Sequence, residues 1–142
     1  MEGRYKTGAH TKHRLLFHIV FIPKYRKRVL RGQLARRLRE MIEEGCRMND
    51  WELKELEVLS DHVHMLIQLN PKDSIAEVMQ RIKGASSRVI RQEFPELEEF
   101  LWGDSLWGDG YFAETVGRVS ETTIVRYLRN QQNKQQVRTH GL

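Results

Sequence analysis

Several features that mark common classes of protein are scarce or missing in this chain. Cys46 is the single cysteine among 142 residues, so the chain can form neither a disulfide framework nor a cysteine-rich zinc site. No apolar run approaches the roughly 20 residues of a membrane span, and the N-terminus does not read as a signal peptide. The nucleotide-binding pattern G-x-x-x-x-G-K-S/T is also missing. We therefore expect a cytoplasmic protein whose chemistry does not depend on a P-loop.

The composition is that of a soluble globular protein, with 39% hydrophobic and 30% charged residues. We expect one domain over residues 1–142, with a loose N-terminal arm over 1–13 and a polar tail over 134–142. Lysine and arginine together number 24, against 19 acidic residues, and the isoelectric point is near 9.6. This excess favours an anionic partner but does not identify one.

The stretch Asp61 to Leu69 (DHVHMLIQL) alternates with period two and predicts a strand. Val63, Met65 and Ile67 share one face, so His62 and His64 point together from the other, roughly 6–7 Å apart at the backbone. Two imidazoles that close can converge on one cation. The pair is therefore a candidate metal site, and the alternative is two polar residues on a half-exposed strand.

An earlier stretch, Arg14 to Ile22 (RLLFHIVFI), is almost continuously apolar and predicts a strand with much of both faces covered. Pro23 ends it. We expect His18, on this strand, to be a hydrogen-bonded residue at the core edge rather than a third ligand, although it could lie near the pair on a neighbouring strand.

A basic segment with one aromatic ring follows that strand: Lys24, Tyr25, Arg26, Lys27 and Arg28. Cations interleaved with an aromatic ring suit phosphates and stacked bases. We favour contact with nucleic acid over a merely solvated face, and a membrane surface is disfavoured because no amphipathic apolar face accompanies the charge.

A second group of cations lies on the helix that Ser74 and Glu77 open as a capping box and that Pro95 ends. Gly84 inside this helix costs about 1 kcal/mol relative to alanine, which suggests that a packed neighbour or a DNA strand approaches the backbone there. We expect the cations around it to contact DNA: Arg81, Lys83 and Arg88.

The remaining patterns complete the fold prediction. Helical spacing covers residues 33–48, strands are expected over 51–59 and 111–116, and a final helix follows Ser120. The order strand, helix, strand, strand, helix, strand, helix predicts an α+β fold. We expect a ferredoxin-like antiparallel sheet with helices on one face, His62 and His64 on the uncovered face, and an additional C-terminal helix.

Two further features concern aromatic residues. The sequence LWGD occurs twice, at 101–104 and 106–109, so Trp102 and Trp107 either stack on bases or plug the edge of the sheet. On the final helix, Tyr127 and Gln131 are four residues apart and therefore lie one turn above each other.

Taken together, five motifs in this order resemble the small HUH single-tyrosine transposases (TnpA type) of minimal bacterial and archaeal insertion sequences. They are HIVFIPKYR (18–26), DHVH (61–64), KGASS (83–87), GYF (110–112) and YLRNQ (127–131). The resemblance covers nearly the whole chain. It implies that His62, His64 and Gln131 bind a divalent metal and that Tyr127, on the C-terminal helix, is the nucleophile. It also implies a substrate of single-stranded DNA with hairpins near each element end.

The chemistry implied by this resemblance is consistent with the residues. A phenol with a pKa near 10 is mostly protonated at neutral pH and needs a nearby positive charge to attack. Ligand softness alone would favour Mn²⁺, Zn²⁺ or Ni²⁺ at a histidine-rich site, whereas the resemblance implies Mg²⁺ or Mn²⁺, which we expect. It further implies a homodimer with active sites shared between chains, and Gly117 before the last helix permits such an exchange.

Two other functions remain open at this point. One is a non-catalytic domain that binds single-stranded nucleic acid, in which the histidines are structural and Tyr127 is a packing residue. The other is a related HUH nuclease of replication or conjugation, which would nick an origin rather than excise an element. The shortness of the chain and the order of its motifs disfavour the second.

Overall fold

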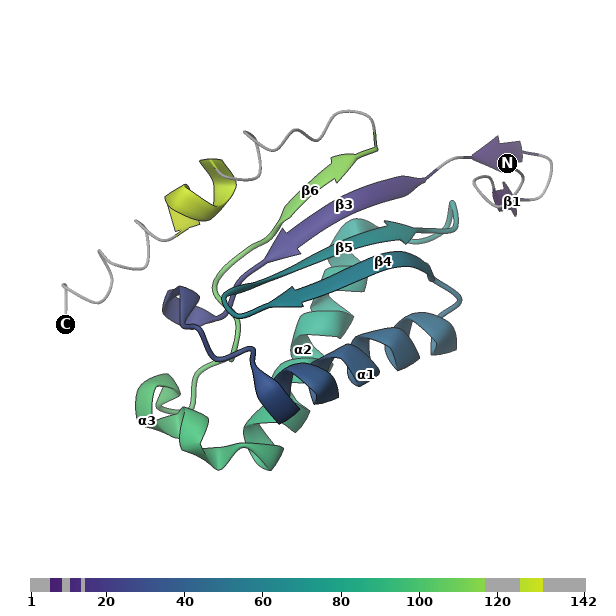
Figure 1. The fold of residues 1–142 in the computed structure, drawn as a ribbon. Coiled ribbons are helices and arrows are strands. Elements are labelled where there is room, and N and C mark those ends of the chain that lie inside the picture. Colours follow the sequence, from purple (N-terminus) through teal and green to yellow (C-terminus); the bar gives the residue numbers. More distant parts are fainter. Residues whose placement is uncertain (1–5, 9–10, 14, 117–125, 132–142) are drawn as a thin grey trace.

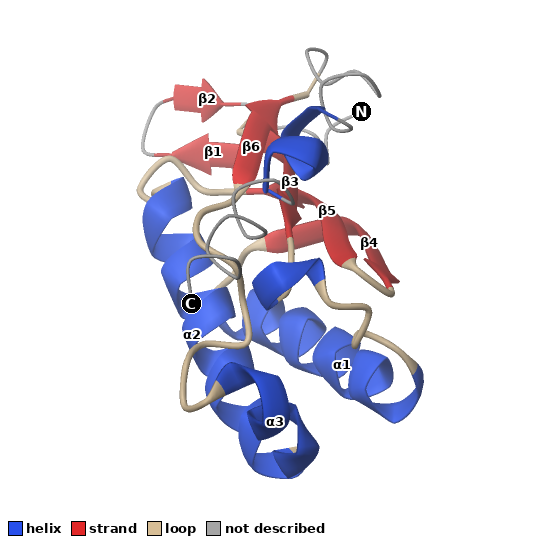
Figure 2. Ribbon diagram, turned by 90° about the vertical axis from the view of Figure 1, so that its left-hand side faces the viewer, coloured by secondary structure: helices blue, strands red, loops and turns tan. Residues whose placement is uncertain are grey.

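The computed structural model describes residues 6–8, 11–13, 15–116 and 126–131 (Figure 1). Its centre is an antiparallel sheet of four strands in the order β4-β5-β3-β6. These strands are β3 (Leu16–Phe21), β4 (Glu52–Leu59), β5 (His62–Gln68) and β6 (Phe112–Thr115). Two long helices, α1 (Gly32–Met48) and α2 (Ile75–Glu93), cover one face of the sheet (Figures 1 and 2). The order β3-α1-β4-β5-α2-β6 is the split β-α-β arrangement, so the predicted ferredoxin-like α+β fold is confirmed.

Shorter elements connect this framework. A single 3₁₀ turn, η2 (Lys24–Arg26), follows β3, while η3 (Pro95–Leu97) and α3 (Glu98–Leu101) follow α2. Residues 126–131 are helical and lie on the side of the sheet opposite α1 and α2 (Figures 1 and 2). Among the described residues, no helix combines the length and apolar character that crossing a membrane requires.

The N-terminal arm has more structure than the sequence pattern predicts. Lys6–Gly8 (β1) pairs antiparallel with Thr11–His13 (β2) as a separate two-stranded sheet. The sequence does not indicate this pairing, because backbone hydrogen bonds between two such short strands need no apolar pattern. The expected polar tail over 134–142 lies outside the described residues.

The main core forms between the sheet and the two long helices. Val63, Met65 and Ile67 are completely buried on the helix side of β5, as the period-two pattern predicts. The i, i+4 series Leu34, Leu38 and Ile42 brings α1 against them. The Ser74 hydroxyl accepts a hydrogen bond from the Glu77 amide at 3.1 Å, which confirms the predicted start of α2.

Strand β3 is covered on both faces. Ile19 and Phe21 belong to the helix-side core, whereas Val20 and Ile22 form a smaller cluster with Leu128 on the opposite side. The prediction that this strand is buried on both sides is therefore confirmed. The expectation that the opposite face of the sheet is uncovered is wrong, because residues 126–131 lie against it.

The two copies of the LWGD sequence place their tryptophans in different environments. Trp107 is 1% exposed; its indole N–H donates to the Ser86 hydroxyl at 2.9 Å, and its ring meets Phe21 edge-on. Trp102 is 86% exposed. Trp107 therefore plugs the core beside β3, whereas the alternative of stacking on bases stays open for Trp102.

Candidate active site

The histidine pair occupies the face of β5 that points away from α1 and α2. His62 and His64 are each half-buried, and the residues between and after them, Val63 and Met65, are completely buried. The strand therefore holds both imidazoles on one rigid surface, as the alternation predicts.

Asp61 positions the first of these imidazoles. Its Oδ1 lies 2.9 Å from His62 Nδ1, and its Oδ2 accepts a hydrogen bond from Arg26 Nε at 3.0 Å. Burial alone would raise the pKa of the Asp61 carboxyl, but the hydrogen bonds and charges of His62 and Arg26 outweigh it and hold that pKa below its usual value. A carboxylate on Nδ1 orients the ring and directs the other nitrogen, Nε2, toward a ligand.

His64 has neighbours on both adjacent strands. Its Nδ1 lies 3.2 Å from Glu57 Oε1 on β4, and its Nε2 lies 3.0 Å from His18 Nδ1 on β3. The rings of His18 and His64 stack, with centroids 5.2 Å apart and planes 10° apart. Burial, and then the charge of His64, lower the pKa of His18, which favours its neutral form. His18 is thus hydrogen-bonded at the core edge, as predicted, and in direct contact with the pair.

The helical segment 126–131 lies beside this pair. Leu128 packs on Val20, and Val20 is the residue that β3 places opposite His64. The ring of Tyr127 packs against Phe112 of β6, with centroids 5.4 Å apart. Burial raises the pKa of the Tyr127 phenol well above its usual value, so this hydroxyl is protonated at neutral pH.

Three buried polar atoms on this side of the molecule have no hydrogen-bond partner among the described residues: Tyr127 Oη, Gln131 Oε1 and Glu114 Oε2. Buried polar atoms are nearly always satisfied in folded proteins, and exceptions mark functional sites or bound groups. Glu114 stands opposite His18 in the β3–β6 pairing. Within the described part of the chain these three atoms are therefore candidates to bind an added group.

These donors fit the metal that the resemblance implies. In the ranges that the structure describes, no three or more His, Cys, Asp or Glu side chains form a metal-binding group, so a cation needs a further ligand besides the two histidines. The amide oxygen of Gln131, which has no partner among the described residues, is a candidate for this ligand, since hard divalent cations bind amide oxygens. Binding through His64 Nε2 would require His18 to release that nitrogen.

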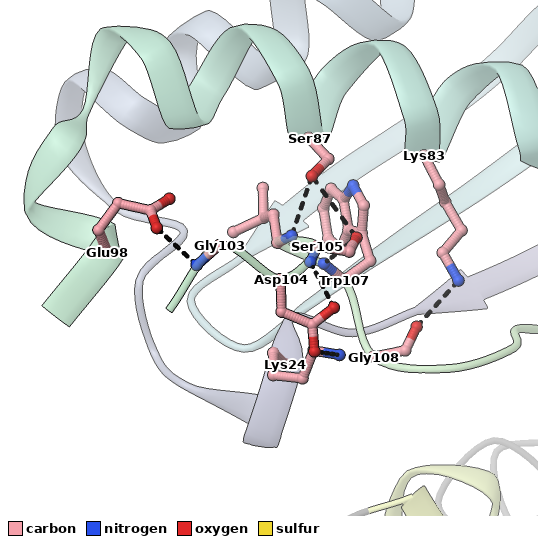
Figure 3. Close-up of polar contacts among 10 residues, drawn as sticks. Lys24, Lys83, Ser87, Glu98, Gly103, Asp104, Ser105, Trp107 and Gly108 are labelled. Carbon is pink, nitrogen blue, oxygen red and sulfur yellow. Dashed lines mark hydrogen bonds and ion pairs between the residues drawn. The ribbon is translucent and has the colours of Figure 1, made fainter. Parts of the chain in front are cut away.

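Two lysines that are expected to contact DNA also bind other parts of the fold. Lys24 is 5% exposed, and its Nζ lies 3.0 Å from Asp104 Oδ2. Lys83 Nζ donates to the carbonyl of Gly108 at 2.9 Å (Figure 3). It also donates to the carbonyl of Gly110 at 2.8 Å. Burial, and then the charge of Lys24, lower the pKa of Lys83. Each ammonium therefore binds the loop that follows α3, and contact of these two lysines with DNA stays a prediction.

The other predicted DNA contacts differ in exposure. Arg26 binds Asp61, and Arg81 donates at 2.8 Å to Oδ1 of Asn49, the residue that caps the C-terminus of α1. Lys27, Arg28 and Arg88 are exposed, and Tyr25 lines a cleft beside α3. A Cβ added at Gly84 would meet no atom within 4 Å from the described residues outside its own stretch of α2, so none of them explains this glycine by close packing.

Sequence reasoning missed the carboxylates around the histidines. The hairpin turn at Ser60 and Asp61 pairs Leu59 with His62 and Glu57 with His64, so the register could have identified Glu57. Alternation along β6 places Glu114 on the same face as Phe112. No local pattern indicates the hydrogen bond from Arg26 to Asp61, because the two residues are 35 positions apart in the sequence and meet only in the folded chain.

Comparison with known proteins identifies the class of protein to which this chain belongs, with its antiparallel sheet, histidine pair and helical tyrosine. The family model described as "Transposase IS200 like" matches residues 11–131. The chain belongs to this family of transposases.

Individual relatives agree with that assignment. The chain is 33% identical over 130 residues to the ISDra2 transposase TnpA of Deinococcus radiodurans, covering 92% of this chain and 93% of the relative. It is 33% identical over 129 residues to the transposase for insertion sequence element IS200 of Salmonella typhimurium, covering 91% and 84%.

Solved structures give the same result. A crystal structure of a candidate transposase from Deinococcus radiodurans superposes with a TM-score of 0.82 at 33% identity, covering 89% of this chain and 97% of that one. A REP-associated tyrosine transposase bound to a REP hairpin superposes with a TM-score of 0.53 at 17% identity, covering 78% and 60%. The second likeness concerns the fold alone.

The ion pair between Lys24 and Asp104 predicts an asymmetric effect of mutation. Asp104→Asn should lower the free energy of unfolding by about 2–3 kcal/mol, because it leaves the buried Lys24 ammonium without its counter-charge. Lys24→Met should lower it by about 1 kcal/mol or less, because the Asp104 side chain is 63% exposed and stays hydrated. Urea denaturation of both variants measures the difference. Equal losses, or the reverse order, would contradict the structural role assigned to Lys24.

Proposed function

We propose that this protein is a metal-dependent DNA transposase that cleaves and rejoins single-stranded DNA at hairpin-bearing ends of an insertion sequence. The reaction proceeds through a 5′-phosphotyrosine at Tyr127. The observation that carries this proposal is that Tyr127 and Gln131 each bury an oxygen that has no partner among the described residues. Both lie on one helical segment, which packs on Val20 of β3, the residue paired with His64.

Each residue has a distinct part in this reaction. Attack by Tyr127 Oη on phosphorus forms a Tyr–O–P bond and breaks the bond to the 3′ oxygen, leaving a free 3′-OH. Rejoining is the same step in reverse, so one phosphodiester replaces another and no ATP is required. Asp61 and Glu57 orient the two imidazoles by contacting their Nδ1 atoms.

The metal is proposed as Mg²⁺ or Mn²⁺, held by His62, His64 and Gln131. When bound, it would polarise the scissile phosphate, stabilise charge on the leaving oxygen and oppose the burial that raises the pKa of Tyr127. The fit rests on the unsatisfied Gln131 oxygen and on the carboxylate that holds each histidine.

DNA is proposed to lie over the exposed cations. Lys27 and Arg28 leave η2 close to Arg26, which is hydrogen-bonded to Asp61 at the histidine site, and Arg88 lines an open cleft on α2 beside Gly84. Cations placed along a surface bind phosphates and make the affinity depend on salt. The hairpin bound to the more distant tyrosine transposase supports a hairpin substrate for this chain.

We propose a homodimer in which each site combines the histidines of one chain with Tyr127 of the other. Moving an element requires two ends to be cut and exchanged, and each chain supplies one Tyr127. In the single chain described here, segment 126–131 packs on its own β3 and β6, which is the arrangement within one chain. Gly117, the expected pivot for an exchange, lies outside the described residues.

Tyr127→Phe is expected to abolish cleavage and the covalent protein–DNA adduct, while hairpin binding and stability stay near those of the wild type. The phenol oxygen has no partner among the described residues, so its removal breaks no hydrogen bond of that part of the fold. Denaturing gels of protein incubated with a labelled hairpin strand and Mg²⁺ detect the adduct. Tyr111→Phe is the matched control and should keep it. An adduct that persists in Tyr127→Phe would place the nucleophile elsewhere and refute the assignment.

His64→Ala is expected to weaken metal binding at least about tenfold and to remove most cleavage. The loss in unfolding free energy should be about 1 kcal/mol, because the half-buried ring leaves one hydrogen bond to His18 unmade. Calorimetric titration with Mn²⁺ measures the affinity, and Lys54→Ala on the neighbouring strand is the control. Unchanged metal affinity would rule out the proposed site.

Mixing two inactive variants tests the shared site. Tyr127→Phe chains keep the histidine pair, and His64→Ala chains keep Tyr127. If sites form between chains, a mixed dimer regains one complete site, and cleavage returns with DNA attached to the His64→Ala chain alone. If each site forms within one chain, both sites of a verified mixed dimer stay inactive. Each variant by itself is the control.

A further inference from the structure

A cleft with aromatic walls lies between η2 and α3, away from the residues assigned to the reaction. Its volume is about 610 Å³, and Tyr25, Phe100 and Trp102 contribute three aromatic rings to its lining. Among the described residues that line it, Asp104 alone is charged, and its carboxylate is paired with Lys24. The cleft is therefore open and aromatic.

Trp102 is placed in a way that folding alone does not favour. Its side chain is 86% exposed, so it contributes little apolar burial to the core. Its backbone lies in the left-handed region, with φ 51° and ψ 45°, where residues other than glycine are strained. Strain at an exposed aromatic residue points to a function in binding.

The loop that carries Trp102 is held in place on both sides (Figure 3). The Gly103 amide donates to Glu98 Oε2 at 2.7 Å, and Arg91 binds the other oxygen of the same carboxylate at 2.8 Å. Asp104 is held by Lys24, and the Leu106 amide donates to the Ser87 hydroxyl at 2.9 Å. The exposed indole is thus presented on an ordered loop, which reduces the entropy lost when a ligand binds.

Positive charge borders the cleft. Lys27 Nζ lies over the Phe100 ring, 5.3 Å from its centroid. Arg28 and Arg31, which follow Lys27 in the chain, line a second groove together with the acidic residue Glu96. Asp104 and Glu98 are neutralised by Lys24 and Arg91. Exposed aromatic rings bordered by cations suit a single nucleic-acid strand, in which bases stack and phosphates meet ammonium and guanidinium groups.

We propose that this cleft binds an unpaired base of single-stranded DNA, stacked on the indole of Trp102, with Lys27 and Arg28 on the flanking phosphates. The proposal rests on the proposed function, because it takes DNA as the partner. Tyr25 in the cleft directly precedes Arg26, which holds Asp61 and through it His62. A strand anchored in the cleft is thereby positioned beside the histidine site.

Tryptophan fluorescence can observe this contact directly. The chain has three tryptophans, of which Trp51 and Trp107 are buried and Trp102 is exposed. Titrating the full chain with an oligothymidylate single strand should quench the long-wavelength emission of Trp102, and a blunt duplex should quench it much less. The experiment uses the Tyr127→Phe background, so cleavage cannot alter the signal.

Substitutions at Trp102 provide the matched affinity test. Trp102→Ala should weaken binding of the single strand at least about fivefold, the lower end of the stacking free energy of one base, with the melting temperature unchanged. Trp102→Phe keeps a stacking face and should retain most of the affinity while losing the quenching. Met48→Ala, at an exposed apolar residue on α1, is the control and should change neither.

The outcomes separate this proposal from the function on which it rests. Unchanged affinity in Trp102→Ala, or no quenching in the parent protein, overturns the base site even if the wild type forms the Tyr127 adduct. Quenching and loss of affinity without any adduct in the wild type support the base site and refute the transposase mechanism. A Trp102→Ala variant that changes oligomeric state but not DNA affinity would make the cleft an interface between chains, and would overturn the proposal.

Discussion

The burial of alternate residues on β5 is the constraint on which the site depends. Val63, Met65 and Ile67 are completely buried against α1 and α2, so the strand cannot rotate or slip by one residue without exposing all three. This burial directs His62 and His64 to the opposite face. The same register places Glu57 opposite His64, and Val20 brings the Tyr127 segment beside them. A hydrophobic pattern therefore determines where the polar groups meet.

Basic side chains have two different roles in this molecule, and the role of each depends on how deeply it is buried. Lys24 and Lys83 lie next to the loop that follows α3, where each binds oxygen atoms of that loop. A buried ammonium is stable only when it is compensated, so these lysines stabilise the loop. Lys27 and Arg28, a few residues further along the chain, remain exposed and available to an anion. The basic segment is thus partly structural and partly a candidate DNA surface.

Much of the fold could be predicted from the sequence, because its strongest signals are local. Alternation identified β5, the serine cap and Pro95 bounded α2, and element order predicted the ferredoxin-like sheet. Within the N-terminal arm, the sequence did not indicate that Lys6–Gly8 and Thr11–His13 pair as antiparallel strands. Backbone hydrogen bonds hold that pair, and they leave no periodic signature in so short a segment.

The sequence by itself determined which residues could form the site: two histidines on one strand face, and a tyrosine and a glutamine one helical turn apart. Both relations follow from the 2.0 and 3.6 periodicities of strands and helices. Only the tertiary structure decided what surrounds them. In that structure Asp61 binds both Arg26 and His62, and His18 contacts His64. Trp107 is buried, whereas Trp102 is exposed. The two LWGD copies are the same locally, and their tryptophans differ because one copy pairs with Pro23 beside the sheet while the other ends α3 at the surface. Burial and ion pairing depend on contacts between distant segments, which local patterns do not encode.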